Sequence, residues 1–465
     1  MDLYGRTKIT TDYDEINREN VLNVLQKAVN VHNKNVTDIN TLYDYYKGKM
    51  DIYNRQKTQR ADINNKIVEN RAKEIVDFKT SYVVGDPMTY SSDDHTETIS
   101  RLNGFCRMEN KITKDYELVE WQNICGTAYR MIQPKDEFEE GESPFTITTV
   151  DPRRAFVIYS SGILGEPMAC VYYTTKTDPE RITTYWVYTH ERCFVIENDD
   201  VVDDLQRGFW ELPMVEYPKN STRVGSFECV IDLLDAINLL DSNRLDGVEQ
   251  FIQSLLVLTN CKLPENYTTT DVARNGIIEL VSNADNKASV EILSQQLDQT
   301  QTQTLKEDFL NAVKSICCMP TRGTGGYGDN GLAVIYRDGW TSAETACKGD
   351  QNNITASEFE TLKVMNTICT NAVNMTIPIW DVKIDFTRNH YENLELKTTA
   401  LLQMLSSPLI NPQTAFEVCG LFSDPIATYR LGQEWYEKNN RAETTTEVRP
   451  TESTDNGVDN DTTEQ

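Results

Sequence analysis

A glycine-rich stretch at residues 321–331, with the sequence TRGTGGYGDNG, lies between two segments that both show helical periodicity. It contains the spacing G-x-G-x-x-G, which in dinucleotide-binding proteins follows a strand and opens a helix inside a βαβ unit. Here apolar side chains recur at helical spacing before the glycines, in residues 305–319, and after them, from residue 332 onward. The stretch is therefore predicted to join two helices, a context that argues against a dinucleotide site. The phosphate-binding motif G-x-x-x-x-G-K-S/T does not occur in the sequence.

The helical pattern before the glycines belongs to a predicted pair of long helices. Residues 225–258 carry apolar side chains at spacings of mostly three and four, which predicts one helix about 50 Å long at 1.5 Å per residue. Residues 298–319 show the second helical pattern, which Pro320 ends. The intervening residues 260–296 contain three short strand-like runs, at 261–264, 276–280 and 290–293. The sequence therefore predicts a small β-containing module at the end of a helical pair.

A further long helix is predicted after the glycines, over residues 332–375. Gly339 and Gly349 lie inside this segment, and a glycine weakens a helix by about 1 kcal/mol relative to alanine. We therefore expect a bent helix, with these two glycines as the candidate bend points. A strand at 382–386 and three short helices at 392–405, 412–419 and 427–438 follow, and a Thr-, Glu- and Asp-rich tail beyond Arg441 is expected to be disordered.

The first part of the chain combines helices with an alternating, sheet-like pattern. Residues 1–40 predict a polar helix, and further helices are predicted at 71–84 and 97–126. Gly85, as a left-handed cap, and Pro87 are expected to end the helix at 71–84. From residue 128 to 201 the apolar period changes to two, which predicts a half-buried antiparallel sheet. The fold class predicted for the whole chain is α+β.

The strongly negative net charge limits the kinds of partner that this chain can bind. It has 72 acidic and 45 basic residues, which gives a net charge of −27. A protein this acidic is not expected to grip nucleic acid along its surface, because carboxylates and phosphates repel each other. The same repulsion would suit a protein that nucleic acid must pass without sticking.

The remaining composition predicts neither a catalytic site nor a metal site. The first residues lack the apolar core of a secretory signal, and the most apolar run, at 251–258, is too short to span a bilayer, so no membrane partner is expected. The 11 cysteines include no C-x-x-C motif and are expected to be reduced thiols of a cytoplasmic protein. The adjacent Cys317 and Cys318 are interpreted as one packing residue and one exposed residue. No carboxylate accompanies a nucleophile or metal motif, so neither enzymatic activity nor a cofactor is expected.

An ordered set of short strings is spread over most of the chain. They are YYKG at 45–48 with NR at 54–55, NNKIVEN at 64–70, GDPMTYSSD at 85–93, DPR at 151–153, PMVEY at 213–217, IDFTRN at 384–389, NPQT at 411–414 and FSDP at 422–425. In their order and spacing these strings resemble the portal proteins of tailed bacteriophages, of the siphophage type. The resemblance extends neither to the first dozen residues nor to the acidic tail.

The resemblance implies a dodecameric ring around a central channel, set at one capsid vertex, through which DNA is packaged and later ejected. Each subunit would contribute a wing at residues 1–224, a stem helix at 225–258, a clip at 259–296, a second stem helix at 297–320, a tunnel loop at 321–331, a long kinked helix at 332–376, a wing strand at 377–389, a crown at 390–440 and the tail at 441–465. The implied partners are other copies of the chain, double-stranded DNA, the terminase large subunit, head-completion or adaptor proteins, and the major capsid and scaffolding proteins. The implied location is the virion, with the host cytoplasm during assembly.

The glycine stretch then has two interpretations, a flexible connector between helices and a mobile loop that touches DNA in the channel. The resemblance favours the second, since glycines let the loop of each subunit take shapes that other side chains would forbid. The candidate loop residues are Arg322, Gly323, Gly325, Gly326, Tyr327 and Gly328, and the candidate channel-lining residues are Lys306 and Lys314, whose simpler interpretation is solvated surface charge. The competing functions are a nucleotide-binding enzyme that uses the glycine loop and another phage head-assembly protein.

Overall fold

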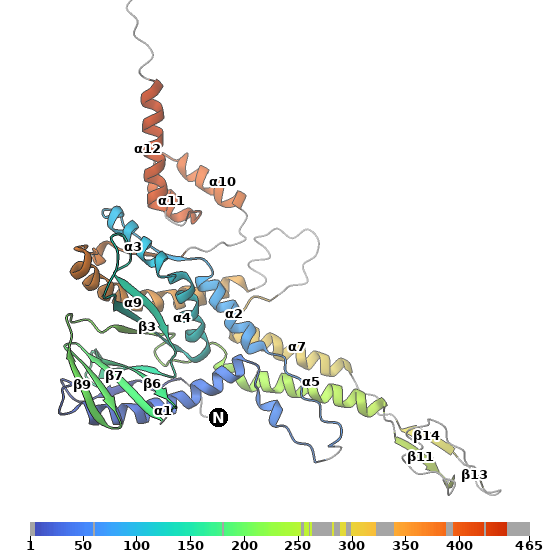
Figure 1. Cartoon of the computed structure of the whole chain (residues 1–465). Helices are drawn as coiled ribbons and strands as arrows, with labels where there is room; N and C mark the ends of the chain where they lie inside the picture. The colour runs from blue at the N-terminus through green and yellow to red at the C-terminus, as the bar shows by residue number, and fades with distance from the viewer. Residues whose placement is uncertain are drawn as a thin grey trace, which may run out of the picture.

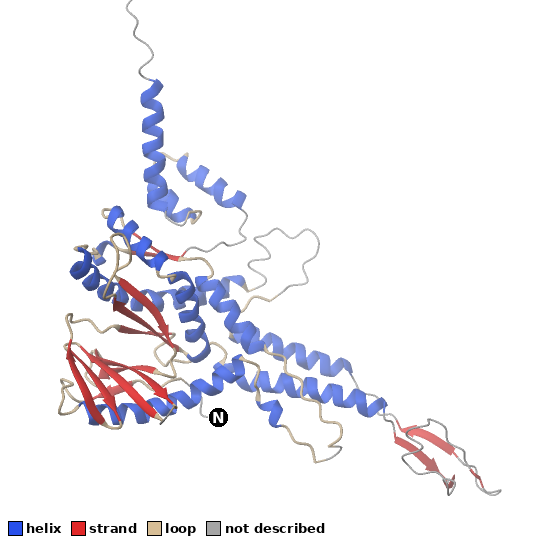
Figure 2. Ribbon diagram, in the orientation of Figure 1, coloured by secondary structure: helices blue, strands red, loops and turns tan. Residues whose placement is uncertain are grey.

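A six-stranded sheet with a long helix packed against it forms one layer of the fold (Figures 1 and 2). The structure is a computed structural model that describes residues 5–58, 61–178, 181–252, 255–259, 261–262, 281–282, 289–293, 299–321, 339–386, 394–422 and 425–443. The strand order is β1-β5-β6-β7-β8-β9, and all neighbours are antiparallel except the parallel pair β1–β5. The strands are β1 (Ile9–Thr11), β5 (Ala155–Ser160), β6 (Pro167–Lys176), β7 (Ile182–Thr189), β8 (Arg192–Glu197) and β9 (Asp200–Gln206).

The helix against this sheet is α1 (Val21–Tyr46), whose Val21, Val24 and Leu25 pack with sheet residues such as Phe156 and Phe194. The alternating pattern thus predicted antiparallel strands correctly, but the prediction of a helix throughout residues 1–40 is wrong. Residues Ile9–Thr11 instead form β1, because pairing with β5 buries Ile9 and Thr11 on one face. A strand of three residues is too short to give a recognisable period in the sequence.

A second, three-stranded antiparallel sheet has the order β10-β3-β4, so the single predicted sheet is in fact two. Its strands are β3 (Thr127–Pro134), β4 (Phe145–Val150) and β10 (Met214–Pro218). A separate antiparallel pair joins β2 (Met88–Ser91) to β15 (Lys383–Phe386), segments far apart in the sequence. This pairing brings the late part of the chain back onto the first part.

Helices α2 (Arg71–Val84), α3 (Thr96–Met108) and α4 (Lys111–Cys125) accompany these sheets. The bounds of α2 match the prediction, and the Asn70 side chain caps its start by accepting a hydrogen bond from the Lys73 N–H. Gly85 does not form the predicted left-handed cap, since its φ of −62° is right-handed. The predicted helix at 97–126 is two helices, because Asn110 adopts φ 53° between them and breaks the hydrogen-bond ladder.

A projecting helical pair follows the second sheet (Figure 1). After the 3₁₀ turn η2 (Glu228–Val230), α5 (Ile231–Ile252) leads to strands β11 (Leu255–Thr259) and β12 (Cys261–Lys262), and β13 (Val281–Ser282) and β14 (Ser289–Leu293) lead back to α7 (Gln299–Ile316). The predicted helix over 225–258 is therefore too long at both ends. Its last apolar residues belong to β11, which pairs antiparallel with β14. A short apolar run such as LLVLT is compatible with either structure in the sequence.

The last part of the chain is helical. The long helix α9 (Trp340–Val373) is followed by the 3₁₀ turn η3 (Ile379–Asp381), β15, and then α10 (Leu394–Leu405), α11 (Pro412–Cys419) and α12 (Pro425–Glu443). Gly349 lies inside α9 as predicted, but Gly339 does not. With φ 80° Gly339 precedes the helix as its N-cap, a conformation that a helix interior excludes. Helix α12 extends to Glu443, so the tail predicted beyond Arg441 begins too early, and its remaining residues lie outside the described ones.

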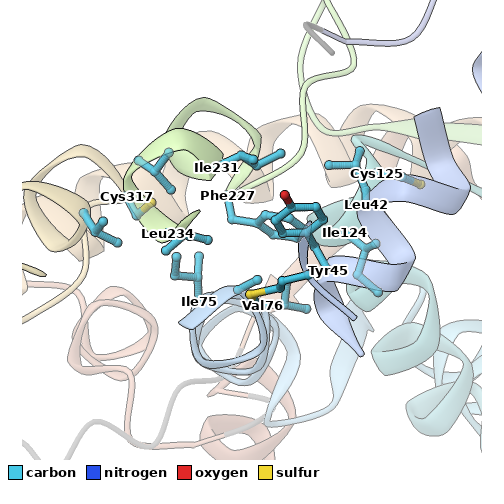
Figure 3. Packing of buried hydrophobic residues seen from close by; sticks show 14 of the residues in the cluster. Leu42, Tyr45, Ile75, Val76, Ile124, Cys125, Phe227, Ile231, Leu234 and Cys317 are labelled. Carbon is cyan, nitrogen blue, oxygen red and sulfur yellow. The ribbon is translucent and has the colours of Figure 1, made fainter. Parts of the chain in front are cut away.

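A hydrophobic cluster marks the place where the front helices meet the root of the projecting pair. It combines Leu42 and Tyr45 of α1, Ile75 and Val76 of α2, Ile124 and Cys125 of α4, Phe227 before η2, Ile231 and Leu234 of α5, and Cys317 after α7 (Figure 3). Burying these side chains contributes about 1.5–3 kcal/mol for each large residue. The pair is thus anchored at its base. Among the described helices, none has a stretch both long and apolar enough to cross a bilayer.

Candidate functional site

The helical pair α5–α7 with its strand-bearing end is the most distinctive part of the molecule and the first candidate site. Figure 1 shows the two helices running side by side away from the body, with β11, β13 and β14 at their far end. Val313 and Cys317 of the α7 side share the basal cluster with Leu234 and Ile237 of α5. Their apolar stripes therefore face each other at the base, as the helical spacing of both segments predicts.

An extended ribbon at residues 64–70 fastens the pair to the body along α5. Three backbone N–H groups, on alternate ribbon residues, donate to side chains four residues apart on the helix. The contacts are Asn65 N to Asp246 Oδ1 at 2.8 Å, Ile67 N to Ser242 Oγ at 2.9 Å and Glu69 N to Asn238 Oδ1 at 2.8 Å. Two residues of extended chain advance about 6.6 Å and four residues of helix about 6 Å, so the two spacings match. The string NNKIVEN that carries part of the family resemblance is this ribbon.

Lys306 of α7 completes this attachment. Its ammonium group lies 2.9 Å from Glu69 of the ribbon and 2.9 Å from Asp241 of α5, and its side chain is 19% exposed. Burial lowers the pKa of Lys306, but its hydrogen bonds to Asp241 and Glu69 prevail and hold the pKa above its ordinary value. The candidate channel-lining residue Lys306 is thus engaged within its own chain. Lys314, in the last turn of α7, is partly buried.

Replacing Lys306 by methionine should destabilise the chain by about 1–3 kcal/mol, because two carboxylates lose the charge that bridges them. The matched change Lys314→Met on the same helix should cost less than about 0.5 kcal/mol. Urea denaturation of both variants, compared with the parent chain, measures the difference. Equal losses of unfolding free energy in the two variants would mean that Lys306 acts only as a solvated surface charge.

The described residues on either side of the candidate tunnel loop lie close together. Its residues Arg322, Gly323, Gly325, Gly326, Tyr327 and Gly328 lie outside the described residues, which stop at Thr321 and resume at Gly339. A β-carbon placed on Gly339 would lie 3.7 Å from the carbonyl oxygen of Met319 and 3.9 Å from the Cα of Pro320. The described chain therefore resumes, just before α9, close to the place where it stops.

A buried network of charges ties α9 to the second sheet and to α4. Glu358 of α9 accepts hydrogen bonds from Arg130 at 2.8 Å and from Tyr217 at 2.6 Å, and its other oxygen lies 3.0 Å from the ammonium group of Lys111. Asp115 pairs with both cations, at 2.9 Å from the Lys111 nitrogen. All four charged side chains are at most 3% exposed. Two cations and two carboxylates cancel, so the network buries no net charge.

The network holds Glu358 ionised in spite of its burial. Burial raises the pKa of Glu358, but Lys111 and Arg130 outweigh it and lower the pKa to about 2. Sequence reasoning missed this cluster, because Arg130 lies in an alternating strand and Glu358 in a long polar helix, where a charged residue normally faces solvent. The unbroken burial of the strand around Arg130 appears only in the structure, so no signal in the sequence could have located the cluster.

Close backbone approaches lock the joint between the body and the projecting pair. Gly126 follows α4 with φ 80°, and a β-carbon on it would lie 2.0 Å from the carbonyl oxygen of Arg223. Buried ion pairs flank this contact, with Arg6 2.7 Å from Glu228 and Arg223 2.6 Å from Glu216. The backbone at the joint is therefore tightly packed, and the charged side chains beside it are paired with one another.

Two cavities in the described part of the chain are small. One is lined by residues such as Arg6, His32 and Tyr129, the other by residues such as Phe78, Tyr82 and Ala343, and each has a volume of about 10 Å³. Such a volume holds about one water molecule, whereas small-molecule sites measure roughly 300–1,000 Å³. Neither cavity offers room for a nucleotide. Within the described ranges, no group of three or more His, Cys, Asp and Glu side chains is placed to hold a metal ion.

Comparison with known proteins gives consistent matches. A family model described as phage portal protein, SPP1 Gp6-like, matches residues 25–442. The portal protein of Bacillus phage SPP1 is 22% identical over 267 residues, which cover 51% of this chain and 51% of that protein. The portal protein of Clostridium phage phiCD119 is 23% identical over 259 residues, which cover 50% of this chain and 54% of that protein. The chain thus spans about half the length of the curated relatives it matches.

Solved structures also resemble this chain. A chain in the neck of an empty GTA particle matches with a TM-score of 0.45 and 9% identity, covering 76% of this chain and 90% of that one.

Proposed function

This chain belongs to the SPP1 Gp6-like family of phage portal proteins, and we propose that copies of it form a ring, a dodecamer, around a channel at one capsid vertex. Double-stranded DNA passes through this channel during packaging and ejection. The observation that carries the proposal is the family match over residues 25–442, which includes both helices of the projecting pair and the long helix α9. The location that follows is the virion, after assembly in the host cytoplasm.

The parts of the subunit take the following roles in this proposal. Helices α5 and α7 are the stem and strands β11–β14 belong to the clip, where the terminase large subunit and later the head-completion or adaptor proteins dock. The sheets and front helices, with β15, form the wing, and α10–α12 form the crown toward the capsid interior, near the scaffolding and major capsid proteins. What supports this division is the single projecting pair with strands at its far end (Figure 1).

The charge of the chain supports passage of DNA without sticking. With 72 acidic and 45 basic residues, a ring of many copies would repel the phosphate backbone over most of its surface. Lys306, one of the two candidate channel-lining lysines, is paired in charge with Glu69 and Asp241. Energy for translocation would come from a separate terminase ATPase, and the proposal assigns no catalysis to this chain.

The mass of the purified full chain in solution tests the ring. A 53.1 kDa subunit should assemble into a closed particle of about twelve times that mass, which native mass spectrometry and electron microscopy would detect. A chain that stays monomeric over a wide range of salt and protein concentration would contradict the proposal.

The glycines of the tunnel loop provide a second test. Deleting Gly323, Gly325, Gly326 or Gly328 one at a time should reduce DNA packaging while rings still form, because each deletion shortens a loop proposed to contact DNA and leaves its helical anchors unchanged. The measurement is packaged DNA per assembled capsid, with ring formation by each variant as the control. Loss of rings in every variant would make the stretch a structural connector.

A further inference from the structure

The second half of α12 carries apolar side chains on a surface that no other described part of the chain covers. Residues 430–439 are all exposed, whereas Ile426 in the first turn is buried. Figure 1 shows α12 rising away from the body, with α11 at its lower end. Leu431 and Trp435, which we call the α12 stripe, are 65% and 67% exposed. Adjoining apolar surface of this kind marks an interaction site.

The contacts on the other side of α12 fix the direction of this stripe. The Tyr429 ring packs against Phe416 of α11, with the two ring centroids 5.6 Å apart. Ile426, on the same side of α12 as Tyr429, is 4% exposed. At about 100° per residue, Leu431 and Trp435 lie on the opposite side of the helix. The α12 stripe therefore faces away from the helix that α12 packs against.

A polar clasp holds α12 in this orientation. The Arg430 guanidinium donates hydrogen bonds to Thr96 Oγ1 at 2.6 Å and to the carbonyl oxygen of Asp93 at 2.9 Å. Both acceptors belong to the body, at the start of α3. Since Arg430 points toward the body, α12 cannot turn the stripe inward without breaking both hydrogen bonds.

Helix α10 carries a second exposed apolar surface. Leu402 is 63% exposed, Leu405 lies one turn further on and is also exposed, and Leu409 just beyond the helix is 94% exposed. We call these three residues the α10 stripe. The neighbouring Leu401 is buried and packs with Ala415 of α11. The α10 stripe thus lies beside the face that α10 turns to α11, and it is separate from the α12 stripe.

Composition and symmetry indicate what covers these surfaces. Residues 444–465, which follow α12, include only two large apolar side chains, Val448 and Val458, so they offer little to bury against either stripe. Pairing of the α12 stripe with itself would give closed dimers and leave the α10 stripe uncovered. Contact between two different surfaces is heterologous, and such contacts build closed rings.

We propose that the α12 stripe of one copy packs against the α10 stripe of the next copy. This inference rests on the proposed function, because it requires a ring, and it assigns the contact between adjacent crowns. Each copy offers one surface and receives the other, so the same contact repeats until the ring closes. Trp435 is the central residue of the contact, since a tryptophan in an apolar interface contributes a large share of its energy.

Photo-cross-linking of assembled rings tests this contact. Unlabelled and ¹⁵N-labelled chains carrying Trp435→p-benzoylphenylalanine are mixed in equal amounts before assembly, irradiated, digested and analysed by mass spectrometry. Cross-links should join position 435 to residues 402–409. About half of the cross-linked peptides should combine a labelled and an unlabelled partner, because neighbours in a ring are drawn at random from the mixture.

Two results of this experiment would overturn the inference in different ways. Rings whose cross-links stay within one chain, or join position 435 to another element, would overturn the crown contact and leave the ring intact. A parent chain that forms no ring at all would overturn the proposed function together with this contact.

A matched pair of substitutions on α10 gives a second measurement. Leu402→Asp should raise the protein concentration needed for half-assembly at least about tenfold, because it places a carboxylate in an apolar contact. Gln403→Asp adds the same charge at an exposed position on the side of α10 away from the stripe, and should change that concentration less than about twofold. Native mass spectrometry over a dilution series measures both variants. Equal effects of the two substitutions would overturn the assignment of the α10 stripe.

Discussion

Glu358→Gln should destabilise the chain by about 3–5 kcal/mol, the cost expected for removing one partner from a buried ion pair. Glutamine keeps the shape of the side chain, but Arg130 and Lys111 then share only the charge of Asp115. One positive charge would remain uncompensated in a region where these side chains are at most 3% exposed. The substitution thus preserves the packing volume of the side chain and removes the charge balance of the buried network.

The same helix supplies a matched control for this change. Glu360 pairs with Lys363 at 2.7 Å, and both of these side chains are at least half exposed. Glu360→Gln should therefore cost less than about 0.5 kcal/mol, since exposed pairs contribute little. Urea denaturation followed by tryptophan fluorescence compares the two variants. Similar losses of unfolding free energy in both variants would mean that the buried network stabilises the chain no more than an exposed ion pair does.

The acid stability of the chain gives an independent readout of Glu358. Its folded-state pKa of about 2 lies below the ordinary value of 4.5, so the unfolded chain binds this proton more tightly. The stabilisation from Glu358 is fully present above about pH 4.5 and is lost as the pH falls toward 2. The Glu358→Gln variant should show a flatter decline of stability over that range than the parent chain.

Gly126→Ala is expected to have the second large effect, also about 3–5 kcal/mol. The new β-carbon would lie 2.0 Å from the Arg223 carbonyl oxygen and 2.3 Å from its carbonyl carbon, both of them backbone atoms. The residue would in addition have to keep φ 80°. Strain of this kind costs roughly 1–3 kcal/mol, and forced repacking roughly the same again. The joint between α4 and the segment before α5 would have to open.

Gly104→Ala is the control, with an expected effect of opposite sign. Gly104 lies inside α3, and a β-carbon on it would meet nothing within 4 Å. Alanine there should stabilise the chain by about 0.5–1 kcal/mol through its helix propensity. Thermal unfolding of both variants gives the comparison. A tolerated Gly126→Ala would show that the joint adjusts without cost.

The sequence predicted best where local signals agree with one another. The bounds of α2 follow from the Asn70 cap at one end and Pro87 just beyond the other, and α11 likewise begins at Pro412 after the Asn411 cap. The misassignments lie where a partner distant in the sequence decides the structure. Residues 255–259 are a strand because β14 pairs with them, and Ile9–Thr11 because β5 does.

The charged interior could not be predicted from local patterns. Arg130 has the spacing of an outward strand residue, yet it is buried because it pairs with Asp115 and with Glu358, which lies more than two hundred positions later. The glycine stretch keeps its sequence-based interpretation as a proposal, because its residues lie outside the described part of the chain.

The ribbon at residues 64–70 limits how this protein can change in length. Alternate N–H groups of the ribbon bond to every fourth residue of α5, so the hydrogen bonds form only when the two segments are in this register. A one-residue insertion or deletion in the ribbon would turn carbonyls toward the acceptor side chains of the helix. An insertion or deletion that keeps these hydrogen bonds must change the ribbon by two residues and the helix by four. Relatives that differ in length near either segment should therefore show paired changes in that ratio, or none.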